Sequence, residues 1–138
     1  MTQNKEDLLK NKKFTCRVSS TLNRNASMFG KKYLFDSDQT TCWNSDQGLP
    51  QWIEIQFDEN LAFSSFAIQF QGGFVGTECL VETSGSEDGN KESEPFYPED
   101  DNSLQVFRLS KQKTCKCIKF LFQGSSDTYG RIVIYKLS

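Results

Sequence analysis

Residues 36–57 read DSDQTTCWNSDQGLPQWIEIQF, and this stretch decides the fold. It begins as an oxygen-rich turn that closes on Trp43, passes through a second turn at 48–50, and then alternates apolar and polar residues over 52–57. A period of two is typical of a strand with one buried face. The apolar members of this strand are Ile53, Ile55 and Phe57. The stretch therefore predicts a turn that leads into a half-buried strand.

Similar alternating segments lie on both sides of this strand. They are 14–18, 66–71, 78–81, 104–109, 117–123 and 131–137. Turn-rich stretches separate them, and none keeps an apolar helical repeat for the three turns of a stable helix. Short strands with turns between them predict an all-β sandwich or barrel. We expect one domain over 14–138, preceded at 1–13 by a flexible polar and basic tail with at most a short helical turn.

The composition indicates how such a domain is stabilised. The chain has 138 residues, of which 36% are hydrophobic, and 12 Phe supply large apolar surfaces for a phenylalanine-rich core. Two strands send aromatic stacks inward, through Phe66, Ile68 and Phe70 on one and Ile118, Phe120 and Phe122 on the other.

No run approaches the roughly 18 apolar residues of a membrane span, and the first seven residues lack a signal peptide's apolar core. We expect a soluble intracellular protein.

The cysteines and the missing histidine bear on metals and on catalysis. Five Cys are an odd number, so reduced thiols are expected, and Cys115 and Cys117 would face the same side of a strand. A zinc site would want different spacing and a second ligand pair, and there is no His. General acid–base catalysis most often uses His. The acidic run 99–101 lies among turn residues and is interpreted as a solvated loop rather than a catalytic carboxylate pair. We therefore predict no enzymatic activity.

The charge balance bears on the kind of partner. The formal net charge is −2 and the isoelectric point is about 5.2, with no basic stripe interleaved with aromatics. Direct binding of nucleic acid lacks its electrostatic footprint.

Residues 83–94 contain no large apolar side chain, and we predict a mobile acidic loop there. The loop ends at Pro95-Phe96-Tyr97-Pro98. Two interpretations of Phe96 and Tyr97 stay open: a contact surface at a loop end, or a plug that closes one end of the sandwich.

The turn Asp36-x-Asp38-x-x-Thr41-x-Trp43, followed by Gln51-Trp52, resembles the coagulation-factor type C or discoidin domain, one of the galactose-binding-domain-like jelly rolls. A narrower resemblance is to the repressor proteins associated with orphan nuclear receptors. The blocks that carry it are 22–25, 29–32, 42–48, 70–74, 96–100, 102–105 and 130–135. It implies a single discoidin-like jelly roll, present in nucleus and cytoplasm, that binds an orphan nuclear receptor and represses its transactivation.

The wider family implies an alternative, because its members bind sugars or phospholipid head groups with loops at one end of the sandwich. The candidate ligand or partner residues on these loops are Asn23, Arg24, Asn25, Phe74, Phe96, Tyr97, Tyr129 and Arg131. Aromatic rings stack on sugars, and Arg and Asn bind hydroxyls. Met28-Phe29, followed by two lysines, could act as a weak membrane wedge. Membrane or glycan binding is the second hypothesis.

The resemblance also implies a calcium site. Relatives hold Ca²⁺ with oxygens of the Asp-x-Asp-x-x-Thr turn and an acid on the last strand, and the turn is present here as Asp36, Asp38 and Thr41. Lys136 occupies the position expected for the acid, and an ammonium cannot ligate a cation. Either the ion is lost and Lys136 neutralises the turn, or other oxygens complete the site. We expect the loss of the ion and no cofactor.

Trp43 and Trp52 also allow two interpretations. Either ring could stack on a sugar, but both stand at or within predicted strands. We therefore expect core or end-plug packing for both.

Overall fold

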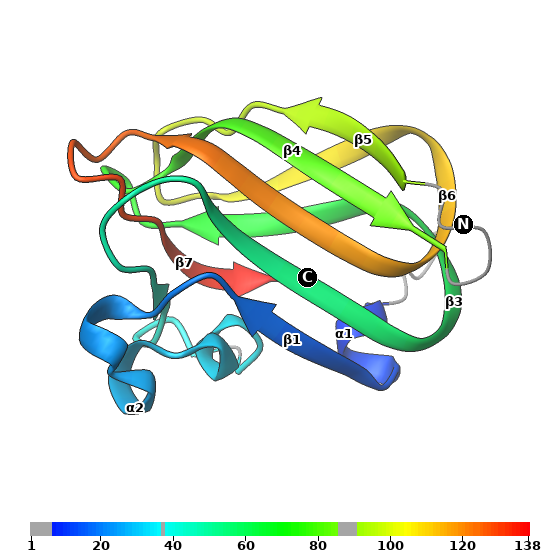
Figure 1. The fold of residues 1–138 in the computed structure, drawn as a ribbon, viewed down its shortest axis with the longest axis horizontal. Coiled ribbons are helices and arrows are strands. Elements are labelled where there is room, and N and C mark those ends of the chain that lie inside the picture. The colour runs from blue at the N-terminus through cyan, green and yellow to red at the C-terminus, as the bar shows by residue number, and fades with distance from the viewer. Residues whose placement is uncertain (1–6, 37, 86–90) are drawn as a thin grey trace.

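The computed structural model describes residues 7–36, 38–85 and 91–138. Its strands are β1 (Phe14–Val18), β2 (Trp43–Asn44), β3 (Gln51–Phe70), β4 (Gly76–Ser84), β5 (Lys91–Phe96), β6 (Leu104–Ser125) and β7 (Val133–Leu137). Its short helices are α1 (Leu8–Asn11), η1 (Leu22–Arg24), α2 (Ala26–Phe29) and η2 (Lys31–Leu34). Every strand pairing is antiparallel, in the order β2-β7-β3-β6-β4-β5 with β1 beside β3. Figure 1 shows the resulting β-sandwich, which confirms the predicted all-β jelly roll.

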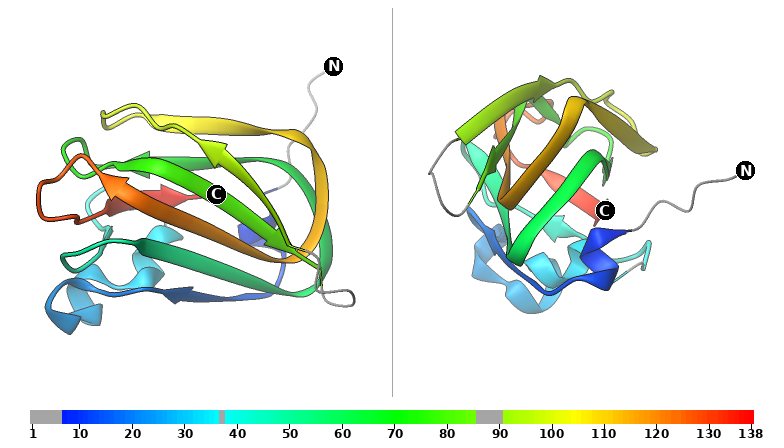
Figure 2. Two further views of the ribbon diagram at one scale, coloured as in Figure 1. Left: turned by 45° about the horizontal axis from the view of Figure 1, so that its top comes forward. Right: turned by 90° about the vertical axis from the view of Figure 1, so that its right-hand side faces the viewer.

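Two long strands connect the layers of the sandwich. β3 and β6 pair with each other from Gln51 opposite Phe122 to Gln69 opposite Leu104, and their register shifts at 56–61 and at 63–65. At these irregularities both strands bend and pass from one layer to the other (Figures 1 and 2). Bulges of this kind let a strand turn a corner without ending. The predicted segments 52–57 and 66–71 are therefore one strand, as are 104–109 and 117–123.

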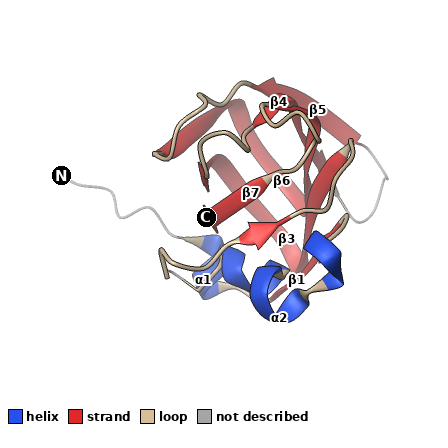
Figure 3. Ribbon diagram, turned by 90° about the vertical axis from the view of Figure 1, so that its left-hand side faces the viewer, coloured by secondary structure: helices blue, strands red, loops and turns tan. Residues whose placement is uncertain are grey.

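The bend divides the sheet into two layers. The front layer contains β1, the first half of β3, the second half of β6, β4 and β5. The back layer contains β2, β7, the second half of β3 and the first half of β6. The short helices lie along one side of the sandwich, beside β1, β2 and β7 (Figure 3).

Aromatic rings fill the space between the layers. Phe66 is at the centre, with ring centroids 5.0 Å from Phe96, 5.0 Å from Phe120 and 5.3 Å from Phe107. The predicted inward faces of 66–70 and 118–122 are buried, which confirms the phenylalanine-rich core. Ile132, Val133 and Ile134 are all at most 2% exposed, because η2 and β2 pack against β7.

Strands occupy both ends of the segment 83–94, for which a loop was predicted. β4 and β5 form a hairpin in which Thr83 pairs with Glu92 and Ser84 with Lys91. Residues 86–90 lie outside the described residues. The polar side chains of β5 did not prevent its pairing with β4, because backbone groups form the hydrogen bonds between these two strands. Side chains of β6 then interact with the polar side chains of β5. Ser110 donates to Glu94, and Lys113 forms an ion pair with Glu92.

All five cysteines are free. Burial raises the pKa of Cys16 and of Cys79 to about 12, so both thiols stay protonated and pack as small apolar groups. Cys115 is buried whereas Cys117 is half-buried, opposite Gln56 and Ser84. The register shift between these cysteines explains why they differ, although the sequence predicted the same side for both.

α1 is the short helical turn expected near the N-terminus, and the Asp7 carboxylate caps it by accepting a hydrogen bond from the Leu9 amide at 3.1 Å. Within the described ranges, no helix has the length and apolar character needed to cross a bilayer.

Candidate functional site

Loops gather at one end of the sandwich, which is on the left in the left view of Figure 2. This loop end is made of residues 19–25, 45–50, 71–75, 97–103 and 126–132, which lie between strands that begin or end there. Hydrogen bonds join the loops to one another. The Gly72 amide donates to the Asn102 side-chain oxygen at 2.7 Å, and the Gly73 amide donates to Asp100 at 2.8 Å. The loop end is therefore a connected surface.

An arginine cluster is the most organised feature of the loop end. The Arg131 guanidinium lies 5.0 Å from the ring centroid of Phe74 and 5.9 Å from that of Tyr129. Asp127 accepts hydrogen bonds from Arg131 Nε at 3.0 Å and from Nη2 at 3.4 Å. The Arg131 side chain is 29% exposed and Tyr129 is 62% exposed. The cluster thus offers an ordered cation between two rings, partly open to solvent.

Local turn geometry explains why these side chains meet. The Asp127 amide donates to Ser125 Oγ at 3.0 Å, and the Arg131 amide donates to the Asp127 carboxylate at 3.1 Å. Gly130 has a φ of +80°, and a Cβ there would stand 3.0 Å from Leu49 Cγ. Glycine is required because the backbone conformation is left-handed and the loop at 45–50 packs directly against it.

The electrostatics keep the pair charged. The Arg131 hydrogen bond lowers the pKa of Asp127 below its ordinary value of 3.8, and Asp127 in turn raises the pKa of Arg131. Each charge stabilises the other. At neutral pH the cluster therefore presents a fixed ion pair rather than a proton donor or acceptor, which does not suit acid–base catalysis.

The predicted residues Asn23, Arg24 and Asn25 lie on a different loop of the same end. Asn23 and Arg24 are exposed and have positive φ angles of 51° and 57°. The Asn25 side chain caps α2 by accepting a hydrogen bond from the Met28 amide at 3.3 Å. Among the described residues, no hydrogen bond or ion pair links these three side chains to the arginine cluster. They are neighbouring candidates, not members of the cluster.

Phe96 and Tyr97 separate into two environments. Phe96 is 6% exposed and packs in the aromatic core, whereas Tyr97 is 73% exposed. The expected pair of contact rings is therefore one core ring and one surface ring, because successive residues of β5 and its extension point to opposite sides of the sheet.

The two tryptophans also differ. Trp43 is fully buried, and its indole N–H donates to the Ser20 carbonyl at 3.0 Å, which confirms core packing. Trp52 is half-buried on the outer face of the front layer, where Lys119 and Arg17 lie 5.0 Å and 5.8 Å from its ring. It does not plug the loop end, because it alternates with the inward Ile53.

The carboxylates of the Asp-x-Asp turn accept hydrogen bonds from other residues of the same turn. Thr41 Oγ1 donates to Asp36 at 2.6 Å, and the Thr40 amide and hydroxyl donate to Asp38 at 2.9 and 2.7 Å. Hydrogen bonds from Thr40 lower the pKa of Asp38. Calcium needs six to eight oxygens, and no group of three or more His, Cys, Asp or Glu is gathered in the described part of the chain. The described side-chain oxygens of Asp36, Asp38 and Thr41 are thus engaged in hydrogen bonds within the turn.

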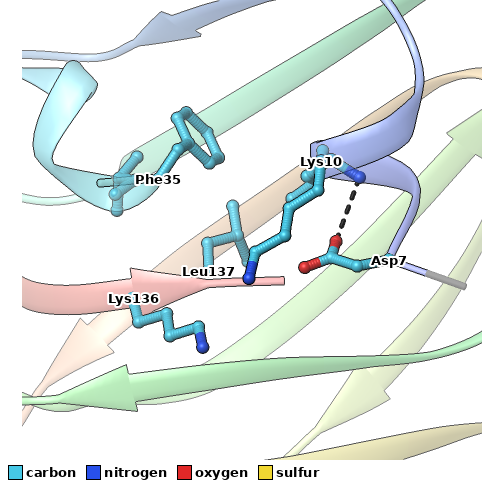
Figure 4. Close-up of a pocket in the computed structure, with 7 residues that line it drawn as sticks. Asp7, Lys10, Phe35, Lys136 and Leu137 are labelled. Atoms are coloured by element: carbon cyan, nitrogen blue, oxygen red, sulfur yellow. Dashed lines mark hydrogen bonds between the residues drawn. The ribbon is translucent and has the colours of Figure 1, made fainter. Parts of the chain in front are cut away.

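Lys136 does not replace that ion through a direct contact. In the described ranges, no ion pair joins it to Asp36 or Asp38. It instead lines a small pocket with Asp7, Lys10, Phe35 and Leu137, where α1 meets the end of β7 (Figure 4). The pocket lies at the other end of β7 from the loop end.

Comparisons with known proteins agree with the fold. No family model matches the chain. The chain is 46% identical over 121 residues to the nuclear receptor 2C2-associated protein of Danio rerio. The alignment covers 88% of this chain and 86% of that protein. The human protein of the same name is also 46% identical, with the same coverage of each chain. The chain belongs to the nuclear receptor 2C2-associated protein family.

The solved structures place this family among the F5/8 type C folds. An F5/8 type C domain from Bacteroides fragilis superposes with a TM-score of 0.78 at 10% identity, covering 90% of this chain and 88% of that one. A chitosan-binding module from Paenibacillus sp., solved with chitotriose, gives a TM-score of 0.73 at 18% identity, covering 93% and 95%. At these identities the likeness shows the fold alone. It confirms the discoidin-like jelly roll for the nuclear receptor 2C2-associated protein family.

Sequence reasoning overlooked two members of the loop end. Asp127 holds Arg131 in place, and Leu49, which is 44% exposed, packs beside Gly130. The spacing of four residues between Asp127 and Arg131 within a turn was the available signal for the first. No sequence pattern indicated Leu49, because Gly130, against which it packs, is distant in the sequence.

Proposed function

We propose that this chain is a non-enzymatic interaction module whose loop end binds an orphan nuclear receptor and represses its transactivation. The observation that carries the proposal is the arginine cluster, in which Arg131 is fixed between Phe74 and Tyr129 by Asp127. Tyrosine and arginine are the side chains that most often dominate the binding energy of protein interfaces. A pre-organised arginine also loses less rotamer entropy on binding.

The surroundings of the cluster support a protein partner. Leu49, Tyr97 and Tyr129 are exposed by 44%, 73% and 62%, and all three belong to the loop end. Exposed apolar side chains with a polar rim are typical of a protein contact surface. The rim is acidic at 99–101, so a partner with basic side chains fits it better than nucleic acid does.

The names of the relatives support the same partner class, since they describe association with a nuclear receptor. Repression through protein contact requires the chain where the receptor is, and we propose nucleus and cytoplasm as its location. A module that covers a receptor surface needs no catalysis to lower transcription.

The test combines binding with a reporter. Wild-type protein immobilised as bait is expected to retain a nuclear receptor from nuclear extract and to lower receptor-driven reporter output when expressed. Arg131→Ala and Tyr129→Ala should weaken both effects by about tenfold or more in affinity, as expected for central interface residues. Arg108→Ala, which removes an exposed arginine from the back layer, is the matched control and should change neither.

Glycan and lipid arrays run beside the pull-down separate the alternatives. Retention of receptor with blank arrays supports the interaction module. Strong array signals that Arg131→Ala abolishes, without receptor retention, would establish the lectin-like or phospholipid-binding function instead. Unchanged receptor binding by all loop-end variants would place the contact elsewhere.

A further inference from the structure

The outer face of the front layer carries two rows of side chains that cross its strands. The charged row, in order across β1, β3, β6 and β4, is Arg17, Glu54, Lys119 and Glu82. The apolar row beside it, across β3, β6, β4 and β5, is Trp52, Leu121, Leu80 and Pro95. Side chains at paired positions of neighbouring strands stand on the same face, so each row is continuous.

This face is open. Figure 1 looks onto the front layer, and the described helices lie below it, not over it. The Arg17 side chain is 72% exposed and that of Glu54 is 25% exposed. Trp52, Leu80 and Leu121 are half-buried, and none of the described helices lies over this face. Soluble proteins usually place polar side chains on an uncovered sheet face, so an apolar row there indicates a contact surface.

The charged row has no net charge but a definite order. Its signs alternate from β1 to β4 as plus, minus, plus, minus. Reversing the order of such a row places each charge opposite one of the other sign. A two-fold axis parallel to the strands, passing between β3 and β6, performs this reversal, because it exchanges β3 with β6 and β1 with β4.

We propose that this face binds a second copy of the same chain, front layer against front layer. Arg17 then faces Glu82 of the second copy, and Glu54 faces Lys119 of the second copy. The same axis sets Trp52 against Leu121 of the second copy, whereas Leu80 falls opposite β1 of the second copy and Pro95 falls beyond that strand. A closed dimer with a two-fold axis requires this self-complementarity, and one operation provides it for the charged row and for the pair Trp52 and Leu121.

The charge pattern favours a second copy over an unrelated partner. A row that sums to zero attracts neither an acidic nor a basic surface, and only an alternating row of the same spacing matches it. Two β-sheets pack face to face about 10 Å apart, which leaves room for the side chains of both faces to interdigitate. Because two rows over four or five strands make a smaller patch than the roughly 800 Å² per partner of a standard interface, we expect a dimer that dissociates at roughly micromolar concentration.

Sedimentation velocity of the full chain across a concentration series tests the proposal. Wild type is expected to shift reversibly from monomer to dimer. Arg17→Glu sets a carboxylate against Glu82 of the second copy, and Glu82→Lys sets an ammonium against Arg17. Each variant alone should dimerise at least about tenfold more weakly, because attraction becomes repulsion at two symmetry-related positions.

Mixing these two variants gives the decisive result. In a mixed dimer, position 17 of one variant and position 82 of the other again carry opposite charges at both symmetry-related contacts. The mixture should therefore associate as strongly as wild type, although neither component does so alone. A merely structural effect of either substitution would not be repaired by mixing.

Two further variants complete the design. Arg108→Glu, a matched charge reversal at an exposed position of the back layer, should leave dimerisation unchanged. Leu121→Lys should abolish it while the thermal midpoint reports that the chain still folds. A wild type that stays monomeric up to about a hundred times the expected micromolar range, a mixture no stronger than its components, or a control that weakens equally would overturn the proposal. Loss of receptor binding by loop-end variants bears only on the proposed function.

Discussion

Arg131 and Asp127 are joined by three hydrogen bonds, two from the guanidinium and one from the Arg131 amide. The carboxylate thus fixes both the backbone of the turn and the direction of the arginine side chain. The order of the arginine cluster depends on this one residue.

We expect Asp127→Asn to destabilise the fold by about 1–2 kcal/mol, because charge-assisted hydrogen bonds are replaced by weaker neutral ones. It should also weaken receptor binding, since Arg131 is freed from its position. Urea unfolding measures the first effect and a binding titration the second. Asp58→Asn, an exposed aspartate at the opposite end, is the control and should change stability by less than about 0.5 kcal/mol.

The same pair predicts a pH dependence. The pKa of Asp127 is lowered from 3.8 by its bond to Arg131, so the stability that this carboxylate adds is complete above 3.8 and is lost as the pH falls through the lower folded value. The stability difference between wild type and Asp127→Asn should therefore be constant near neutral pH and shrink below 3.8. A difference that grew on acidification would contradict this assignment.

Truncation of two neighbouring aromatic residues should lower the unfolding free energy by very different amounts. Phe96→Ala is expected to cost about 3–5 kcal/mol of unfolding free energy, because it leaves a cavity among Phe66, Phe107 and Phe122. Tyr97→Ala, one residue further on, should cost less than about 0.5 kcal/mol, because its ring is exposed. Chemical denaturation of both variants measures the two costs, and equal losses would show that Tyr97 is also packed.

Alanine substitutions at two glycines of the loop end distinguish the cost of backbone strain from the cost of steric crowding. Gly130 and Gly73 have φ angles of +80° and +90°, but only Gly130 has neighbours, within 3.0–3.2 Å of where a Cβ would stand. Gly73→Ala should cost about 1 kcal/mol for strain alone. Gly130→Ala should cost about 1–3 kcal/mol more, because Leu49 and Gly48 must move. Thermal unfolding of both variants checks the difference, and equal losses would mean that the loop at 45–50 yields freely.

Calcium is expected to leave the thermal midpoint unchanged. The described oxygens of Asp36 and Asp38 accept hydrogen bonds from Thr40 and Thr41, and Lys136 stands on the last strand. Titration with millimolar Ca²⁺, followed by a chelator, measures the midpoint. A rise that the chelator removes would show that the turn opens to bind the ion.

Much of the fold was predictable because period-two patterns are local. The alternation over 52–57, 66–70 and 118–122 correctly assigned the buried faces. The strand β5 was missed because Lys91 to Glu94 carry no apolar pattern, and its pairing with β4 is a contact between distant backbone groups. The continuity of β3 through 58–60 was missed for a similar reason, since a bulge and a turn use the same polar residues.

The site was less predictable than the fold. Phe74, Tyr129 and Arg131 were singled out as separate candidates, and the structure brings them together because two loops meet at the end of the sandwich. Asp127 was not singled out, although it fixes the Arg131 side chain between them. A hydrogen-bond network depends on side-chain directions within turns, which composition and spacing do not fix. Phe96 failed as a surface candidate because one step along a strand reverses its face.

The passage of β3 and β6 through both layers has a consequence for motion. Neither layer can separate from the other without breaking the pairing of a strand that belongs to both. Amide hydrogens in the two layers should therefore exchange with solvent only through the same rare global opening, while those of the loop end exchange by local fluctuation. The loop end can then fluctuate locally while the sandwich beneath it opens only as a single cooperative unit.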